Sequence, residues 1–282
     1  MSKIIALVDG SDYSESVCHH VGWIAGRIGA SVDLFHVLGR REGGNGDLSG
    51  NLRLGARSKI MSDLAELDAQ RAKLAQAQGR AILEDAKALI EGDGVTGVTP
   101  HLRIGDIVET VTSQEQGADL IVVGKRGEAA DFAKMHLGSN LERIVRAAST
   151  PVFVANRAFK PIEKVLIAFD GGISAMKAVD YVARDPLFAG LDCTVVTVGT
   201  PNESVRRGLD DAKATLAAGG HQAQVKVVEG QPDTALGNMV DTEGHDLLVM
   251  GAYGHSRIRT MIIGSTTTQM IRTCKVPVVL VK

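Results

Sequence analysis

The chain has 282 residues, with 31 Lys and Arg against 33 Asp and Glu, and a formal net charge of -2. This length predicts about two domains, and the near-neutral charge gives no electrostatic reason to bind nucleic acid or an anionic membrane surface. Cys18, Cys193 and Cys274 form no paired framework, which favours a reducing compartment. Because we find neither a signal-peptide pattern nor an apolar stretch of bilayer length, we expect a cytoplasmic protein with a small-molecule or protein partner.

Short β-branched runs alternate with amphipathic segments of helix length, which predicts parallel strands joined by crossover helices. In the first half we expect five strands, near residues 4–8, 32–36, 99–102, 120–123 and 152–155. They should be apolar on both faces, as a buried parallel sheet requires.

An insertion separates the second and third of these strands. Residues 39–57 are rich in glycine, and 58–91 form one long predicted helix in which Gly79 is a candidate break. We interpret the insertion 39–91 as a solvated extension of the crossover helix, with a lid or a partner-docking arm as the alternative.

The second half repeats the strand pattern without the insertion. Its strands are expected near residues 165–169, 194–198, 224–228, 247–250 and 278–281. The boundary falls in the stretch 156–164, which contains Pro161. The predicted domains are therefore 1–157 and 163–282, and both belong to the doubly wound α/β class.

One glycine motif occurs at matching places in both halves. It comprises Gly124, Gly127, Gly138 and Ser139 in the first half and Gly251, Gly254, Gly264 and Ser265 in the second. Thirteen residues after the glycine of each Gly-Ser pair, Pro151 and Pro277 open an apolar run. The chain is thus a tandem repeat of one domain, of the size that binds a single nucleotide.

The first strand of each half ends in an acidic residue, at Asp9 and Asp170. Open parallel sheets bind ligands beyond the carboxyl ends of their strands, where the strand order reverses. A carboxylate there can bind a ribose hydroxyl or a magnesium-bound phosphate, and the alternative role is a helix N-cap. Twenty-eight residues after each Asp stands a valine, Val37 or Val198, whose backbone is a candidate for pairing with an adenine edge.

The glycine motif suits a polyphosphate. A glycine that ends a strand lets backbone approach a ribose or phosphate, and the Gly-Ser pair opens a helix whose amides and dipole attract phosphate oxygens. Lys125 and Arg126 in one loop, and Arg257 and Arg259 in the other, either neutralise phosphate charge or are solvated loop charges.

The spacing G-x2-G-x9-G-[ST] after the fourth strand resembles the nucleotide-binding branch of the universal stress protein family, in its tandem two-domain form. Domain 2 matches this spacing residue for residue, whereas domain 1 has one residue more between Gly127 and Gly138. The resemblance implies further contact positions at Ala168, Met250 and Thr266 in domain 2 and at Leu7, Val123 and Asn140 in domain 1.

The resemblance also implies a fold and a ligand. Each domain is expected to be flavodoxin-like (adenine nucleotide alpha hydrolase-like), with a five-stranded parallel sheet of order 3-2-1-4-5. The two domains are expected to pair through their fifth strands. The sequence does not decide whether the whole chain also forms a homodimer. The implied ligand is ATP, with or without magnesium.

Three functions remain open at this point. The first is an ATP-binding stress-response regulator or sensor with little or no catalysis, which acts on a protein partner of unknown identity. The second is a slow magnesium-dependent ATP hydrolase that uses Asp9 or Asp170. The third is a scaffold with one or both pockets empty or holding another small ligand. The run Cys18-His19-His20 is not expected to bind a metal, because adjacent helical residues point to different sides.

Overall fold

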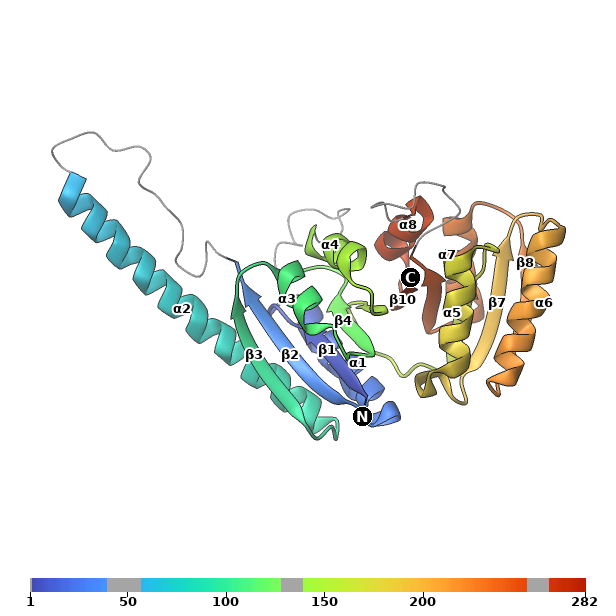
Figure 1. The fold of residues 1–282 in the computed structure, drawn as a ribbon, viewed down its shortest axis with the longest axis horizontal. Coiled ribbons are helices and arrows are strands. Elements are labelled where there is room, and N and C mark those ends of the chain that lie inside the picture. The colour runs from blue at the N-terminus through green and yellow to red at the C-terminus, as the bar shows by residue number, and fades with distance from the viewer. Residues whose placement is uncertain (1, 40–56, 128–138, 253–263) are drawn as a thin grey trace.

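The computed structural model describes residues 2–39, 57–127, 139–252 and 264–282 (Figure 1). Ten strands form one sheet in the order β3-β2-β1-β4-β5-β10-β9-β6-β7-β8. The strands are β1 (Lys3–Leu7), β2 (Ser31–Leu38), β3 (Val98–Ile104), β4 (Leu120–Gly124), β5 (Val152–Ala155), β6 (Lys164–Ala168), β7 (Asp192–Val198), β8 (Gln224–Val228), β9 (Leu247–Gly251) and β10 (Val278–Val281).

Each half of this sheet has the predicted order 3-2-1-4-5, counted from its outer edge. Within each half all neighbouring strands are parallel, and β5 pairs with β10 in the antiparallel sense, with Phe153 opposite Val279. The expected pairing of the two domains through their fifth strands is therefore present within one chain.

Helices cover both faces of the sheet (Figure 1). Residues of α1, α2, α5 and α6 share one buried apolar cluster, and residues of α3, α4, α7 and α8 share the other. The helices are α1 (Asp12–Ile28), α2 (Arg57–Gly92), α3 (Ile107–Gln114), α4 (Ser139–Ala147), α5 (Ile173–Arg184), the short 3₁₀ helix η3 (Pro186–Phe188), α6 (Glu203–Ala218), α7 (Pro232–Glu243) and α8 (Ser265–Thr273).

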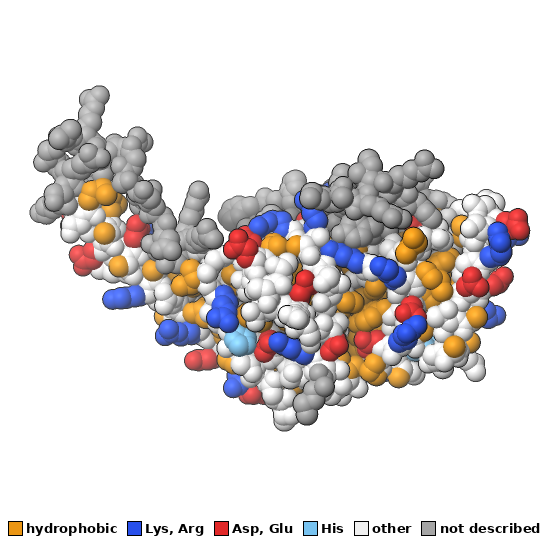
Figure 2. Space-filling model, viewed as in Figure 1, with side chains coloured by type: hydrophobic (Ala, Val, Ile, Leu, Met, Phe, Trp, Pro, Cys, Tyr) orange, Lys and Arg blue, Asp and Glu red, His pale blue; other side chains and the backbone are white. Residues whose placement is uncertain are grey.

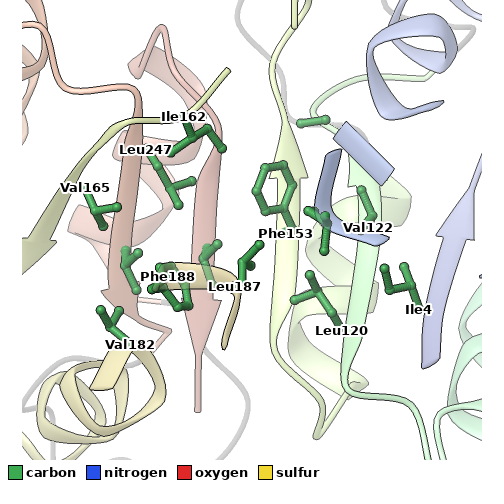
Figure 3. Close-up of a cluster of buried hydrophobic side chains, with 14 of the residues drawn as sticks. Ile4, Leu120, Val122, Phe153, Ile162, Val165, Val182, Leu187, Phe188 and Leu247 are labelled. Carbon is green, nitrogen blue, oxygen red and sulfur yellow. The ribbon is translucent and has the colours of Figure 1, made fainter. Parts of the chain in front are cut away.

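The apolar core continues from one domain into the other. Figure 3 shows Phe153 of β5 on the domain 1 side of a cluster that includes Leu187 and Phe188 of η3 on the domain 2 side. Arg27 of α1 supports the same junction, because its guanidinium donates hydrogen bonds to the carbonyls of Leu187 and Ala189. The two domains thus share a buried interface besides the strand pair.

The outer strands differ from the expectation of two apolar faces. In β3, Thr99, Pro100 and Arg103 are exposed, and β8 likewise presents Gln224 and Val227 to solvent. Both strands lie at the ends of the sheet, where one row of backbone groups has no neighbouring strand and proline is tolerated. The expectation, which concerned the strands of the first half, was wrong for β3 because it treated an edge strand as a central one.

The predicted long helix is α2, and Gly79 does not break it. A Cβ at this position would lie 2.8 Å from His36 Cδ2 and 2.8 Å from Leu102 Cδ1. Glycine is therefore present because the helix approaches β2 and β3 closely, and not because the helix ends. The glycine-rich residues 40–56 lie outside the described part of the chain.

The described surface is mixed in charge. On the face seen in Figure 2, Lys and Arg side chains are interspersed with Asp and Glu over both domains. Among the described ranges, no helix combines the length and the apolar character needed to cross a membrane.

Candidate functional site

Asp9 lies in a tight turn between the end of β1 and the start of α1. Its Oδ1 accepts hydrogen bonds from the backbone N of Ser11 (3.0 Å) and from Ser14 Oγ (3.2 Å). Ser14 Oγ in turn accepts from the backbone N of Asp9 and of Gly10. Ser11, not Asp9, is the N-cap of α1, so the carboxylate orders the turn at the carboxyl edge of the sheet without capping the helix.

Asp170 occupies the corresponding place in domain 2. Its Oδ1 accepts a 2.8 Å hydrogen bond from the backbone N of Gly172, and Gly172 is the N-cap residue of α5. The alternative role of this aspartate as a helix N-cap is therefore wrong here too. The exposed Asp170 stands at the point where β6 separates β7 from β9, which is the reversal point of the strand order.

The glycine loop of domain 1 lies against this turn. A Cβ on Gly127 would be 2.7 Å from Asp9 Oδ2, and a Cβ on Gly124 would be 2.9 Å from Tyr13 Cβ. Real Cβ atoms essentially never come this close to another heavy atom. The structure therefore brings Gly127 against Asp9 and Gly124 against Tyr13, and a side chain at either glycine would force its neighbour to shift.

In domain 2, Gly251 and the start of α8 lie side by side. A Cβ on Gly251 would be 2.6 Å from Ser174 Oγ, while Thr267 Oγ1 donates to the carbonyl of Gly251 at 3.3 Å. The N-cap of α8 is Gly264, whose N–H reaches the Ala252 carbonyl at 3.5 Å. The first amides of any helix have no acceptor within it, so this helix start presents its positive end beside the end of β9.

The candidate contact residues on the strands form adjacent pairs. Leu7 of β1 is in register with Val123 of β4, and Ala168 of β6 is in register with Met250 of β9. Val198 is the last residue of β7. All of these positions lie at the carboxyl ends of neighbouring strands.

Val37 is the penultimate residue of β2, so it also lies near a carboxyl end. Ser139 and Asn140 are the first two residues of α4, and Ser265 and Thr266 are the first two of α8. Gly138, Gly254, Arg257 and Arg259 lie outside the described residues.

Lys125 is half-buried, so it is not the solvated loop charge that was the alternative to a phosphate contact. Its Nζ donates a 2.8 Å hydrogen bond to the backbone carbonyl of Cys274, in the other domain. Burial lowers the pKa of this lysine to about 8, because desolvation disfavours its charged form. Lys125 therefore binds the end of a helix in domain 2.

Sequence reasoning missed the residues on which the glycines pack. Tyr13 contacts Gly124, and Ser174 contacts Gly251. Both stand four residues after the aspartate of their domain, and that shared offset is the signal that could have identified them.

The arrangement of potential metal-ligating side chains among the described residues gives no support to a metal site. Within the described ranges, no group of three or more His, Cys, Asp or Glu side chains is arranged to hold a metal ion. Cys18 is buried, and burial raises the pKa of its thiol to about 12. His20, two residues further along α1, is also buried.

The sequence matches the family described as "Universal stress protein family" over residues 1–156 and 161–282. A universal stress protein of Synechocystis sp. is 33% identical over 283 residues, which is 99% of either chain. A universal stress protein of Mycobacterium tuberculosis is 30% identical over 140 residues, covering 42% of this chain and 94% of that protein. The crystal structure of a universal stress protein from Archaeoglobus fulgidus has a TM-score of 0.69 at 23% identity, covering 99% of this chain and 98% of that chain, and supports the fold.

Proposed function

Because the chain belongs to the universal stress protein family, we propose that it is a nucleotide-dependent regulator that binds ATP at the carboxyl edge of each domain. The observation that carries this proposal is the contact between Gly127 and Asp9, where a Cβ would be 2.7 Å from the carboxylate. A glycine loop beside a carboxylate at the reversal point of a parallel sheet is a place that suits a ribose and phosphates, because a carboxylate can bind ribose hydroxyls and glycine lets backbone approach a phosphate.

The second domain has the loop spacing that matches the nucleotide-binding pattern without an extra residue. We assign the phosphates to Gly251, Gly254 and Gly264 and to the first turn of α8, at Ser265 and Thr266. Asp170 is assigned to the ribose hydroxyls, and the backbone of Val198 to the adenine edge, with Ala168 and Met250 flanking it. Bound ATP would supply the negative charge that the positive end of α8 favours.

The first domain has corresponding groups. We assign the ribose to Asp9, the adenine region to Leu7, Val37 and Val123, and the phosphates to the loop around Gly124 and Gly127. Gly138, Ser139 and Asn140 complete that set. The extra residue between Gly127 and Gly138 leads us to expect weaker binding in this domain.

The hydrogen bonds of Asp9 and Asp170 favour little or no catalysis. Oδ1 of Asp9 accepts from Ser11 and Ser14, and Oδ1 of Asp170 accepts from Gly172, so each carboxylate holds its own turn. In-line phosphoryl transfer needs a group that positions the attacking water in addition to a phosphate cradle. We therefore propose that ATP acts as a signal that orders the loops and alters a surface read by a protein partner.

Two related assignments belong to this proposal. We assign residues 1–157 and 163–282 to the two domains, and the junction between them to the segment that joins β5 and β6. We also propose a cytoplasmic location, since Cys18, Cys193 and Cys274 are all free thiols and thiols persist in reducing compartments.

Titration calorimetry with ATP and magnesium tests the proposal on full-length protein that carries no retained nucleotide. We expect two equivalents of ATP per chain and little release of phosphate over the experiment. Asp170→Asn should weaken binding in domain 2. A matched control is Asp180→Asn, because Asp180 pairs with Arg184 on the exposed side of α5. Absence of ATP binding would overturn the proposal in favour of a scaffold, and rapid phosphate release would replace it with a hydrolase.

A further inference from the structure

We propose that Lys125 is a positioning residue for the nucleotide site of the opposite domain, acting through helix α8. This inference rests on the proposed ATP site in domain 2. It assigns to one side chain a link between the glycine loop of domain 1 and the phosphate-binding helix of domain 2.

The link is made of two short contacts. The backbone N of Lys125 donates to the Ala155 carbonyl at 2.9 Å, which fixes the loop against the end of β5. The Nζ of the same residue donates at 2.8 Å to the carbonyl of Cys274, the C-cap residue of α8. A cation at a helix C-terminus is favourably placed, because it meets unpaired carbonyls and the negative end of the helix dipole.

Helix α8 is short, so a shift of its C-terminal end also shifts its N-terminal turn. It has nine residues, which corresponds to about 13 Å at 1.5 Å per residue. Its C-terminal end is held by Lys125, and its N-terminal turn at Ser265 and Thr266 is the part assigned to the phosphates. A displacement of the C-terminal end therefore moves the amides that would face the phosphates.

A symmetric pair of contacts shows what is specific to Lys125. Asn156 follows β5 and donates through Nδ2 to the Lys275 carbonyl at 2.8 Å, and Lys282 follows β10 and donates to the Arg146 carbonyl at 2.8 Å. Each domain thus reaches the C-terminal end of the other domain's last helix. The two contacts are similar in place but differ in detail, because Asn156 binds a carbonyl just beyond the C-cap of α8, whereas the ammonium of Lys282 binds a carbonyl in the last turn of α4.

Lys125 has no counterpart in that symmetry. The equivalent position in the loop of domain 2 is Ala252, which is fully buried and has no side-chain donor. Helix α8 is therefore held at its C-terminal end by Asn156 and Lys125, whereas the corresponding Ala252 cannot contribute such a bond to α4. Among the described residues of the two loops, this additional bond joins only the loop of domain 1 to the last helix of domain 2.

This arrangement links the two sites thermodynamically. ATP in domain 1 would order the loop from Gly124 to Gly127 and thereby fix Lys125, which favours the position of α8 that binds ATP in domain 2. Such coupling is reciprocal for equilibrium binding. The lysine is half-buried, so releasing its bond would leave a poorly hydrated cation without its acceptor.

The test compares Lys125→Met and Lys125→Arg with wild type in calorimetric titrations with ATP and magnesium. To isolate domain 2, each substitution is also placed in an Asp9→Asn background, which weakens the site of domain 1. We expect Lys125→Met to weaken binding to domain 2 about fivefold, within the range of coupling factors of roughly 5 to 150, and we expect Lys125→Arg to retain most of the affinity.

The matched control is Lys275→Met. Lys275 lies next to Cys274 and pairs with Asp241 at 2.6 Å, so this change removes the same charge from the same region without cutting the link between the domains. Equal loss of affinity in the control would overturn the inference, as would unchanged binding to domain 2 in Lys125→Met. If Lys125→Met does not fold, Lys125→Gln takes its place in the same comparison.

These outcomes separate the inference from the proposed function. Wild-type protein that binds no ATP overturns both. Wild-type protein that binds two equivalents, with Lys125→Met indistinguishable from it in domain 2, overturns the role of Lys125 alone.

Discussion

Replacing His20 with phenylalanine should make the protein less sensitive to acid. This side chain of α1 has no solvent exposure and lies between the rings of Phe153 and Phe159, with centroid distances of 5.2 and 5.0 Å. Its Nδ1 donates to the Ser16 carbonyl at 2.7 Å, and its Nε2 has no hydrogen-bond partner among the described residues. The imidazole is therefore held in its neutral form in a largely apolar setting.

The size of the effect follows from the pKa. Burial lowers the pKa of His20 from 6.5 to about 4. Between these values the unfolded chain binds a proton that the folded chain does not, so stability falls as the pH falls. The full shift corresponds to about 3 kcal/mol at 1.36 kcal/mol per pKa unit, of which about 2 kcal/mol is lost between pH 7 and pH 5.

Urea denaturation at pH 7 and pH 5 measures this difference directly. We expect His20→Phe to lose about 2 kcal/mol less than wild type between the two pH values, and to be about 1 kcal/mol more stable at pH 7 because the unpaired Nε2 is gone. His20→Gln should flatten the pH dependence equally without the gain at pH 7. The reasoning fails if His20→Phe shows the same loss of stability on acidification as wild type.

Three further changes test other parts of the structure. Gly127→Ala should weaken ATP binding in domain 1 about tenfold, because the new Cβ would lie 2.7 Å from Asp9 Oδ2 and displace this carboxylate, and calorimetry should show no such loss in Gly26→Ala, where a Cβ meets nothing within 4 Å. Phe153→Ala should destabilise the junction by about 3–5 kcal/mol, and an unchanged urea midpoint would contradict the shared core. In the folded protein, the pKa of Lys125 is lowered from 10.5 to about 8, so wild type should gain stability relative to Lys125→Met as the pH rises from 8 to 10. Urea denaturation at these pH values measures the difference in free energy of unfolding between the two proteins. A difference that does not change with pH would contradict the lowered pKa.

The central part of the fold could be read from the sequence because its signals are local. The run from Leu247 to Gly251 is apolar at its first four positions, and such runs have few alternatives to a buried strand. The tandem glycine motif then placed each strand in its domain. The contact of Gly127 with Asp9 was accessible in the same way, because both residues belong to one repeated pattern.

Features that depend on distant neighbours could not be read in this way. Whether Thr99 of β3 is exposed depends on which strand ends the sheet, and this is a property of topology. Gly79 has the composition of a helix break, yet its reason lies in His36 and Leu102. In the sequence, Lys125 resembles a phosphate ligand because it stands beside the glycines. Only the structure shows that its side chain extends across the domain junction and donates to the Cys274 carbonyl.

The junction of β5 with β10 also bears on how such a molecule can evolve. In an assembly of two identical chains, a lysine introduced at this loop position would occur on both sides of the axis. Covalent fusion removes that constraint, since each half always meets the other half and never a copy of itself. One half can then carry Lys125 while the other carries a buried Ala252, so a single gene can acquire a directional difference between two otherwise similar halves.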